Sequence, residues 1–475
     1  MTATVRTRTT AAGRAATAAG AGTAAGSTTR GRPAAGFALL GAVQTTLIFT
    51  LASLAVPLPR IGDELGLDRA DLLLLSAAYG LTFAGLLLFG GRITDRYGGR
   101  RALTAGLLVF GAASALAPLA PGYGPLLAAR FSQGLGAALV APAAMGVLRT
   151  LYPAPAAYGR AMATWGGLSV LGATAGNLLS GVVSAFTSWR WSFAVPVAVT
   201  TAALALAPRL LPATPATGRA ARGLDLPGAL LATGGITLAS YGLVRTDARP
   251  WGSVAVLVPL LAGLVLLGAF ALVERRAADP LLPPAFLRDR RRGLGLAAVS
   301  LTASGTAGVF VLLSLGLQRD RGWSALLTSG AFAPFAVALL VAGRAAGPLI
   351  RRHGAGRATA AGLGAGAAGL ALLAATGFDP ATPYACGLLP GLLLLATGAA
   401  VSFAGAGVLA TEGVPPERSG LAGGVLNTAM ELGPTVVLAA VLTLGTDAAS
   451  LAATALGFAA LAALAALAAP ASRPT

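Results

Sequence analysis

The fold of this chain is decided by a short polar stretch, GRITDRYGGRR, at residues 91–101. The stretch holds four arginines and one aspartate, and it lies between two long apolar runs, 71–90 and 102–120. Its three glycines lack a Cβ atom and therefore allow the backbone to turn tightly. The pattern predicts a short charged connection between two membrane-spanning helices.

Composition places the whole chain in a lipid environment. Hydrophobic residues make up 56% of the 475 residues and charged residues only 11%, with a mean hydropathy of +0.77. A soluble domain carries about a quarter charged residues. A chain of this length with so little charge must be solvated mostly by lipid.

The basic residues are unevenly distributed. Of the 34, all arginine, we place 26 in the tail or in connections on one side of the membrane and seven on the other, with Arg130 inside a run. The positive-inside rule makes the arginine-rich side cytoplasmic, so both termini are expected in the cytoplasm and the protein in the inner membrane. This asymmetry accounts for the net charge of +18 without a nucleic-acid partner. Without lysine the chain has no Walker-type loop, which argues against ATP hydrolysis.

Fourteen apolar runs of roughly 18–25 residues are each long enough to cross a bilayer as a helix. They are too long and too uniformly apolar for the strands of a barrel. The predicted fold is an all-α integral membrane protein. The runs lie at 36–58, 71–90, 102–120, 124–148, 161–183, 191–212, 225–245, 252–273, 293–317, 324–343, 358–376, 384–409, 421–445 and 448–469.

An internal repeat divides the helices into two bundles. GPLIRRHG at 347–354 matches GRITDRYG at 91–98 at an offset of 256 residues, with Arg351 in the place of Asp95. Repeats of this kind build transporters whose binding site lies at the midplane between two halves. The predicted domains are a disordered basic tail at 1–35, a six-helix bundle at 36–212, two inserted helices and a linker at 213–292, a second six-helix bundle at 293–469 and a tail at 470–475.

Four motifs resemble signatures of the major facilitator superfamily of secondary transporters. Residues 91–101 resemble the family's signature Gly-x-x-x-Asp-Arg-x-Gly-x-Arg-Arg between helices 2 and 3. RFSQGLG at 130–136 resembles the helix 4 signature of proton-coupled exporters. GATAGNLLSG at 172–181 resembles the glycine-rich helix 5 signature of antiporters, with Asn177 in place of a proline. WRWSF at 189–193 resembles the start of helix 6 in the fourteen-helix drug/proton antiporters.

The resemblance implies a conformational latch on the cytoplasmic side. Asp95 would face the N-terminus of the thirteenth run near Ser419–Gly420, where the helix dipole is positive, with Arg149 as an ion partner. The small residues of the fifth run, Gly172, Gly176 and Gly181, would pack tightly against a neighbouring helix. The predicted latch residues are Gly91, Asp95, Arg96, Gly98, Arg100, Arg101 and Arg149.

The first helix departs from the drug/proton antiporter branch, because Thr50 stands where that branch has an aspartate. Glu431, about midway along the thirteenth run, is a candidate replacement, since a desolvated carboxylate in a membrane takes up a proton readily. The alternatives are a Glu431 held in a helix interface and an Arg130 that reaches the membrane surface. The candidates for proton coupling or substrate binding are Arg130, Gln133, Glu431, Asn427, Asn177 and Gln44.

Together these features predict a proton-coupled transporter of the multidrug or antibiotic exporter type that works by alternating access. We expect a monomer whose partners are protons, lipid and a small lipophilic substrate. One alternative is an uptake or facilitated-diffusion carrier for a small metabolite, and another is a non-transporting membrane sensor or scaffold. Neither an enzyme nor a metal or cofactor site is expected, because His353 is the only histidine and Cys386 the only cysteine.

Overall fold

The computed structural model is almost entirely helical in the residues that it describes. Eleven helices within these residues are long and apolar enough to cross a membrane, and each overlaps one of the fourteen predicted runs. The helical membrane fold is therefore confirmed, and the count of fourteen stays a prediction. The described residues are 26–54, 57–67, 69–213, 225–247, 249–277, 280–319, 321–323, 325–376, 382–415, 418–442, 452 and 454–461.

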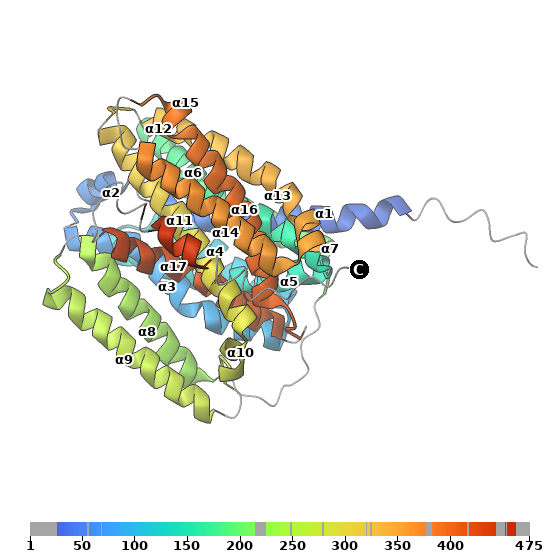
Figure 1. Cartoon of the computed structure of the whole chain (residues 1–475). Helices are drawn as coiled ribbons and strands as arrows, with labels where there is room; N and C mark the ends of the chain where they lie inside the picture. Colours follow the sequence, from blue (N-terminus) through green and yellow to red (C-terminus); the bar gives the residue numbers. More distant parts are fainter. Residues whose placement is uncertain are drawn as a thin grey trace, which may run out of the picture.

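The N-terminal half contains six long helices and three short connecting elements (Figure 1). The long helices are α1 (Gly26–Ala52), α3 (Arg69–Tyr97), α4 (Gly99–Leu116), α5 (Tyr123–Leu151), α6 (Pro155–Phe186) and α7 (Ala194–Leu210). The short elements are α2 (Leu58–Leu65), η1 (Ala117–Leu119) and η2 (Trp189–Phe193).

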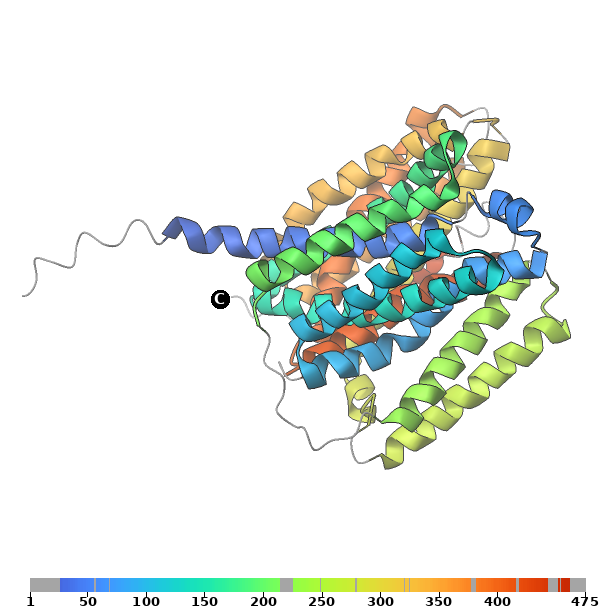
Figure 2. The same cartoon turned by 180° about the vertical axis from the view of Figure 1, so that it is seen from behind.

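Two inserted helices and a C-terminal half follow. The inserted pair, α8 (Leu226–Val244) and α9 (Val254–Arg276), lies side by side along one flank of the molecule (Figures 1 and 2). Between them is η3 (Arg245–Asp247), and α10 (Pro284–Arg288) lies in the linker that follows. The C-terminal half contains α11 (Arg290–Arg319), α12 (Ala325–Ala331), α13 (Ala333–His353), α14 (Ala355–Thr376), α15 (Tyr384–Gly387), α16 (Leu389–Thr411), α17 (Ser419–Leu442) and a last helical segment at 454–461.

The polar stretch at 91–101 is mostly helical, which corrects the expected charged loop. Helix α3 continues to Tyr97 and α4 begins at Gly99, so Gly98 alone joins them, with φ 88° and ψ 143°. The repeat is built in the same way, since Gly354 alone joins α13 to α14, with φ 82° and ψ 160°. Helical hydrogen bonds do not depend on lipid, so each helix runs on past its apolar part until a glycine turns the chain.

The start of α1 corrects the predicted boundary of the tail. The helix begins at Gly26, so residues 26–35, assigned to a disordered tail, are helical. Its apolar candidate span begins only at Pro33. Once a helix is nucleated, adding a turn needs little further free energy, so the helix extends beyond its apolar part. The remainder of the predicted tail, 1–25, lies outside the described residues.

Glycines allow neighbouring helices to approach at backbone distance. A Cβ at Gly90 of α3 would collide with the carbonyl of Ala138 in α5, and a Cβ at Gly91 would lie 2.5 Å from the carbonyl oxygen of Gly420 in α17. In lipid, helices associate through such close packing, because burial from lipid brings no hydrophobic gain. Two consecutive glycines of α3 therefore contact different neighbours, one in its own bundle and one in the opposite bundle.

We expect Gly98→Ala and Gly354→Ala each to destabilise the protein by about 1–3 kcal/mol, because an L-residue is strained at these angles. Thermal unfolding of the detergent-solubilised protein measures the effect. The control is Gly364→Ala in α14, where a Cβ meets nothing within 4 Å and alanine favours the helix. An equal unfolding temperature for all three variants would contradict this account of the repeat.

Candidate functional site

Arg130 lies in a buried polar cluster inside the N-terminal half, and its Nε and Nη2 atoms have no hydrogen-bond partner among the described residues. Its side chain is fully buried, and its Nη1 atom donates to the carbonyl of Thr50 at 3.2 Å and to Gln133 Oε1 at 3.1 Å. The guanidinium carbon lies 5.1 Å from the ring centroid of Tyr79, a cation–π geometry. Gln133 Nε2 in turn donates to Ser114 Oγ at 2.9 Å. Arg130 therefore does not extend to the membrane surface in this structure.

Tyr79 of α3 belongs to this cluster. Its hydroxyl donates to the carbonyl of Leu47 at 3.0 Å. Glu431 of the C-terminal half belongs to α17. Sequence analysis missed Tyr79. A hydroxyl within an apolar run was the available signal, because a buried Tyr hydroxyl needs a hydrogen-bond partner.

The remaining polar candidates make separate contacts. Asn427, one turn before Glu431, is fully buried, and its Nδ2 atom donates to the carbonyl of Gly423 at 2.8 Å. Gln44 of α1 donates through Nε2 to Ser169 Oγ of α6 at 3.2 Å. The Oδ1 atom of Asn427 and the Oε1 atom of Gln44 have no hydrogen-bond partner among the described residues. The side chain of Asn177 lies outside them.

Two of the predicted packing glycines, Gly172 and Gly176, hold α6 against α1. A Cβ at Gly172 would collide with the carbonyl of Thr45, and a Cβ at Gly176 would lie 2.6 Å from the carbonyl oxygen of Phe49. The four-residue spacing therefore forms one close contact strip along α1. The surroundings of Gly181 are not among the described parts of the structure.

At the arginine-rich end of the bundle, Asp95 joins the two halves. Its Oδ1 atom accepts a hydrogen bond from the backbone N–H of Gly420 at 2.5 Å, and Oδ2 accepts one from Leu421 at 2.8 Å. These amides belong to the first turn of α17, whose dipole favours a negative charge. Arg92 and Arg418 supply the positive charges that act on this carboxylate.

Arg149 does not take the place predicted for it beside Asp95. Its guanidinium lies over the Tyr158 ring of α6, 6.0 Å from the ring centroid, because the last turn of α5 faces that helix. Arg96 likewise lies over the Tyr97 ring at 5.5 Å. Arg100 donates to the carbonyl of Leu211 at 3.3 Å, and Arg101 is exposed.

At the opposite end, Glu64 of α2 accepts two hydrogen bonds from η2. Trp189 Nε1 donates to Oε2 at 2.7 Å, and Arg190 Nη1 donates to Oε1 at 2.6 Å. Arg190 also donates to the carbonyl of Pro118 at 3.0 Å. The hydrogen bonds from Trp189 and then Arg190 lower the pKa of Glu64 below its ordinary 4.5. The Trp-Arg-Trp motif therefore ties together three connections of the N-terminal half.

These features define a multi-pass helical membrane protein with an arginine buried inside one half and an aspartate that joins the two related halves. A family model described as Major Facilitator Superfamily matches residues 38–437. The chain belongs to this family, and it is a transport protein rather than an enzyme.

Named relatives agree with this assignment. The puromycin resistance protein of Streptomyces alboniger is 38% identical over 87% of this chain and 82% of its own length. The cephamycin export protein of Amycolatopsis lactamdurans is 38% identical over 84% of this chain and 82% of its own length. The lincomycin resistance protein of Streptomyces lincolnensis is 33% identical over 86% of this chain and 83% of its own length.

Solved structures share the fold. A human organic anion transporter superposes with a TM-score of 0.63 at 19% identity, covering 91% of this chain and 99% of its own. A proton:xylose symporter superposes with a TM-score of 0.64 at 15% identity, and the match covers 93% of this chain and 96% of the symporter.

The Glu64 contacts predict a stability difference that depends on pH. Because the pKa of Glu64 is lower in the folded state, its contribution is fully present above the ordinary value of 4.5 and is lost as the pH falls through the folded value. Glu64→Gln should therefore lower the unfolding temperature near neutral pH and approach wild type in acid. Asp63→Asn, at an exposed neighbour, is the control. An unfolding-temperature difference that stays constant with pH would contradict the ionic role.

Proposed function

We propose that this chain is a proton-coupled secondary transporter that exports a drug-like compound or secondary metabolite by alternating access. The arginine-rich end lies in the cytoplasm with both termini, and the protein acts as a monomer in the cytoplasmic membrane. The relatives named for puromycin and lincomycin resistance and for cephamycin export support the substrate class. All three are matched over more than four fifths of their length.

The observation that carries the proposal is the presence of ionisable side chains inside long helices of both halves, Arg130 of α5 beside the Tyr79 ring and Glu431 of α17. A charged group inside a membrane protein is costly and marks an ion or substrate pathway by default. Here the guanidinium comes from α5 and the carboxylate from α17, so a movement of one half against the other changes their separation. Protonation of Glu431 would remove one of the two charges and alter the balance between the two arrangements of the halves.

In this structure the two halves are in close contact at the arginine-rich end. Asp95 caps α17 there, and Gly347 of α13 lies against α6, where a Cβ would meet the carbonyl oxygen of Ala156 at 2.8 Å. We take Asp95 as the latch of this state, and the repeat position in the second half carries Arg351 instead. Opening toward the cytoplasm requires the Asp95 hydrogen bonds to break, so their strength sets the balance between the two states.

Asp95→Asn should shift the protein toward the cytoplasm-open state by about 1–3 kcal/mol, because hydrogen bonds to a charged group are stronger than neutral ones. Spin labels at positions 101 and 352, at the cytoplasmic ends of the two halves, should show a larger population at long distance. The exposed Cys386 is first replaced by Ser.

The control for this experiment is Asp289→Asn. Asp289 also accepts backbone N–H bonds at a helix start, from Arg291 at 2.9 Å and Arg292 at 3.2 Å, within the C-terminal half. An Asp95→Asn distance distribution identical to wild type would exclude the latch.

Substrate-driven proton movement in liposomes tests the function directly. Puromycin, lincomycin and a cephamycin are added to protein reconstituted with an internal pH dye, for wild type and for Glu431→Gln. We expect proton flux with at least one compound and the loss of this flux in the variant, because a glutamine side chain cannot take up and release a proton. Asp63→Asn should behave as wild type.

The other outcomes separate the alternatives. Proton flux that persists in Glu431→Gln would make this side chain structural. Direct uptake of a compound by wild type with no proton flux would favour a facilitated-diffusion carrier. No transport of any compound by a well-folded protein would contradict the proposed substrate class.

A further inference from the structure

A pair of acidic side chains lies at the cytoplasmic end of the inserted helices, away from the cluster above. Asp225 precedes α8 with φ 44°, the only positive φ among the described non-glycine residues. Its Oδ1 atom accepts from the N–H of Gly228 at 3.1 Å, and Oδ2 accepts from that of Leu281 at 3.1 Å. Glu274, in the last turn of α9, accepts from the N–H of Leu282 through Oε2 at 2.9 Å. The two carboxyl groups therefore hold consecutive amides of the linker.

The two carboxyl groups also meet each other. Both converge beside Gly228, where a Cβ would lie 2.5 Å from Asp225 Oδ2 and 2.7 Å from Glu274 Oε1, and they are within hydrogen-bonding reach. Glu274 is only 3% exposed, and its Oε1 atom has no donor among the described residues. Two ionised carboxylates offer only acceptors and repel each other, so this contact requires a proton between them.

We infer that Asp225 and Glu274 together bind one proton, and that this proton holds the linker segment 280–283 against the inserted helices. Within the described residues, the groups that face the pair are the two carboxyls, one from the residue that precedes α8 and one from α9, and the linker amides of Leu281 and Leu282. Arg275 and Arg276 are exposed on the same turn as Glu274. This site is separate from Glu431 and does not depend on the proposed transport function.

The linker is in turn packed against both halves of the molecule. Leu281 and Phe286 are buried in one apolar cluster with Leu88 of α3 and with Leu421 and Val425 of α17. These are the two helices that Asp95 joins. Occupancy of the proton site therefore stabilises the packing of the linker over the contact between the halves.

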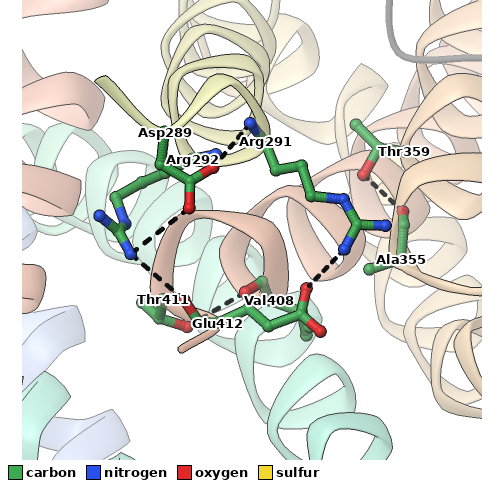
Figure 3. Close-up of polar contacts among 8 residues, drawn as sticks. All are labelled: Asp289, Arg291, Arg292, Ala355, Thr359, Val408, Thr411 and Glu412. Atoms are coloured by element: carbon green, nitrogen blue, oxygen red, sulfur yellow. Dashed lines mark hydrogen bonds and ion pairs between the residues drawn. The ribbon is translucent and has the colours of Figure 1, made fainter. Parts of the chain in front are cut away.

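The other end of the linker is held by arginine side chains. Arg292 Nη1 donates to the carbonyl of Phe286 at 2.8 Å, and Nη2 reaches the carbonyl of Glu412 at 3.4 Å. Figure 3 shows Arg292 between Asp289 and Glu412, with Arg291 directed to the Glu412 carboxylate at 4.0 Å. The site of Asp225 and Glu274 therefore lies at the 280–283 end, where we expect the pH response.

The sign of the response follows from proton counting. The docked linker holds one proton on the pair, whereas the two carboxyls in water are both ionised near neutral pH. The docked state binds more protons, so docking is favoured at lower pH and is lost as the cytoplasmic pH rises.

Hydrogen exchange of the full-length protein in lipid nanodiscs tests the inference. For wild type, the protection of the Leu281 and Leu282 amides, corrected for intrinsic exchange, should fall about tenfold per pH unit once the proton is released. Glu274→Gln should keep these amides protected and remove the slope, because the glutamine amide can donate to Asp225 without titrating. Asp289→Asn should retain the wild-type slope.

Two further measurements separate a proton site from a merely structural contact. Infrared spectra in a Glu431→Gln background should contain the band of a protonated carboxylic acid, and Glu274→Gln should remove it. Gly228→Ala places a methyl group between the carboxyls and should lower protection at every pH.

A flat pH profile for wild type together with no acid band would mean that a cation holds an ionised pair, and would overturn the inference. Loss of protection in Glu274→Gln at all pH values would overturn it as well, because the side chain would then act only through its charge.

Discussion

The structure depends on close backbone contact between helices in a medium that offers no hydrophobic driving force. Gly91 lies against Gly420 across the two halves, and Gly90 lies against Ala138 within the first half. A side chain at either position would collide with the backbone of the neighbouring helix and force the two helices apart. The same absence of Cβ atoms that holds α3 to α17 also brings the carboxylate of Asp95 to the first amides of α17.

Buried charge is the second constraint, and the protein meets it in three ways. Arg130 is stabilised by a ring face and two oxygen acceptors, and Asp95 by a helix N-terminus. Asp225 and Glu274 accept hydrogen bonds from backbone amides, and their carboxyl groups lie together beside Gly228. Each solution joins elements distant in sequence, and in the case of Asp95 these elements belong to different halves.

Prediction from sequence was strongest where a local pattern carried the information. Apolar run length placed the helices, and the 256-residue repeat placed Gly98 and Gly354 at equivalent turns. It was weaker at helix ends, as at Gly26, because helical hydrogen bonding continues beyond the apolar segment. In the site, the motif indicated Arg130 and Gln133, but Tyr79 was missed because its role depends on the position of a helix from another part of the chain.

By itself the sequence determined that the chain is a helical membrane protein and that its arginines gather in particular connections between the helices, because each follows from composition or from local spacing. Tertiary structure alone decided the partners. Arg149 turned to Tyr158 rather than to Asp95, and Glu274 met Asp225 across the inserted helix pair. The reason is physical: a side chain's partner is set by how helices pack and rotate against one another, and that arrangement is a property of all the contacts together.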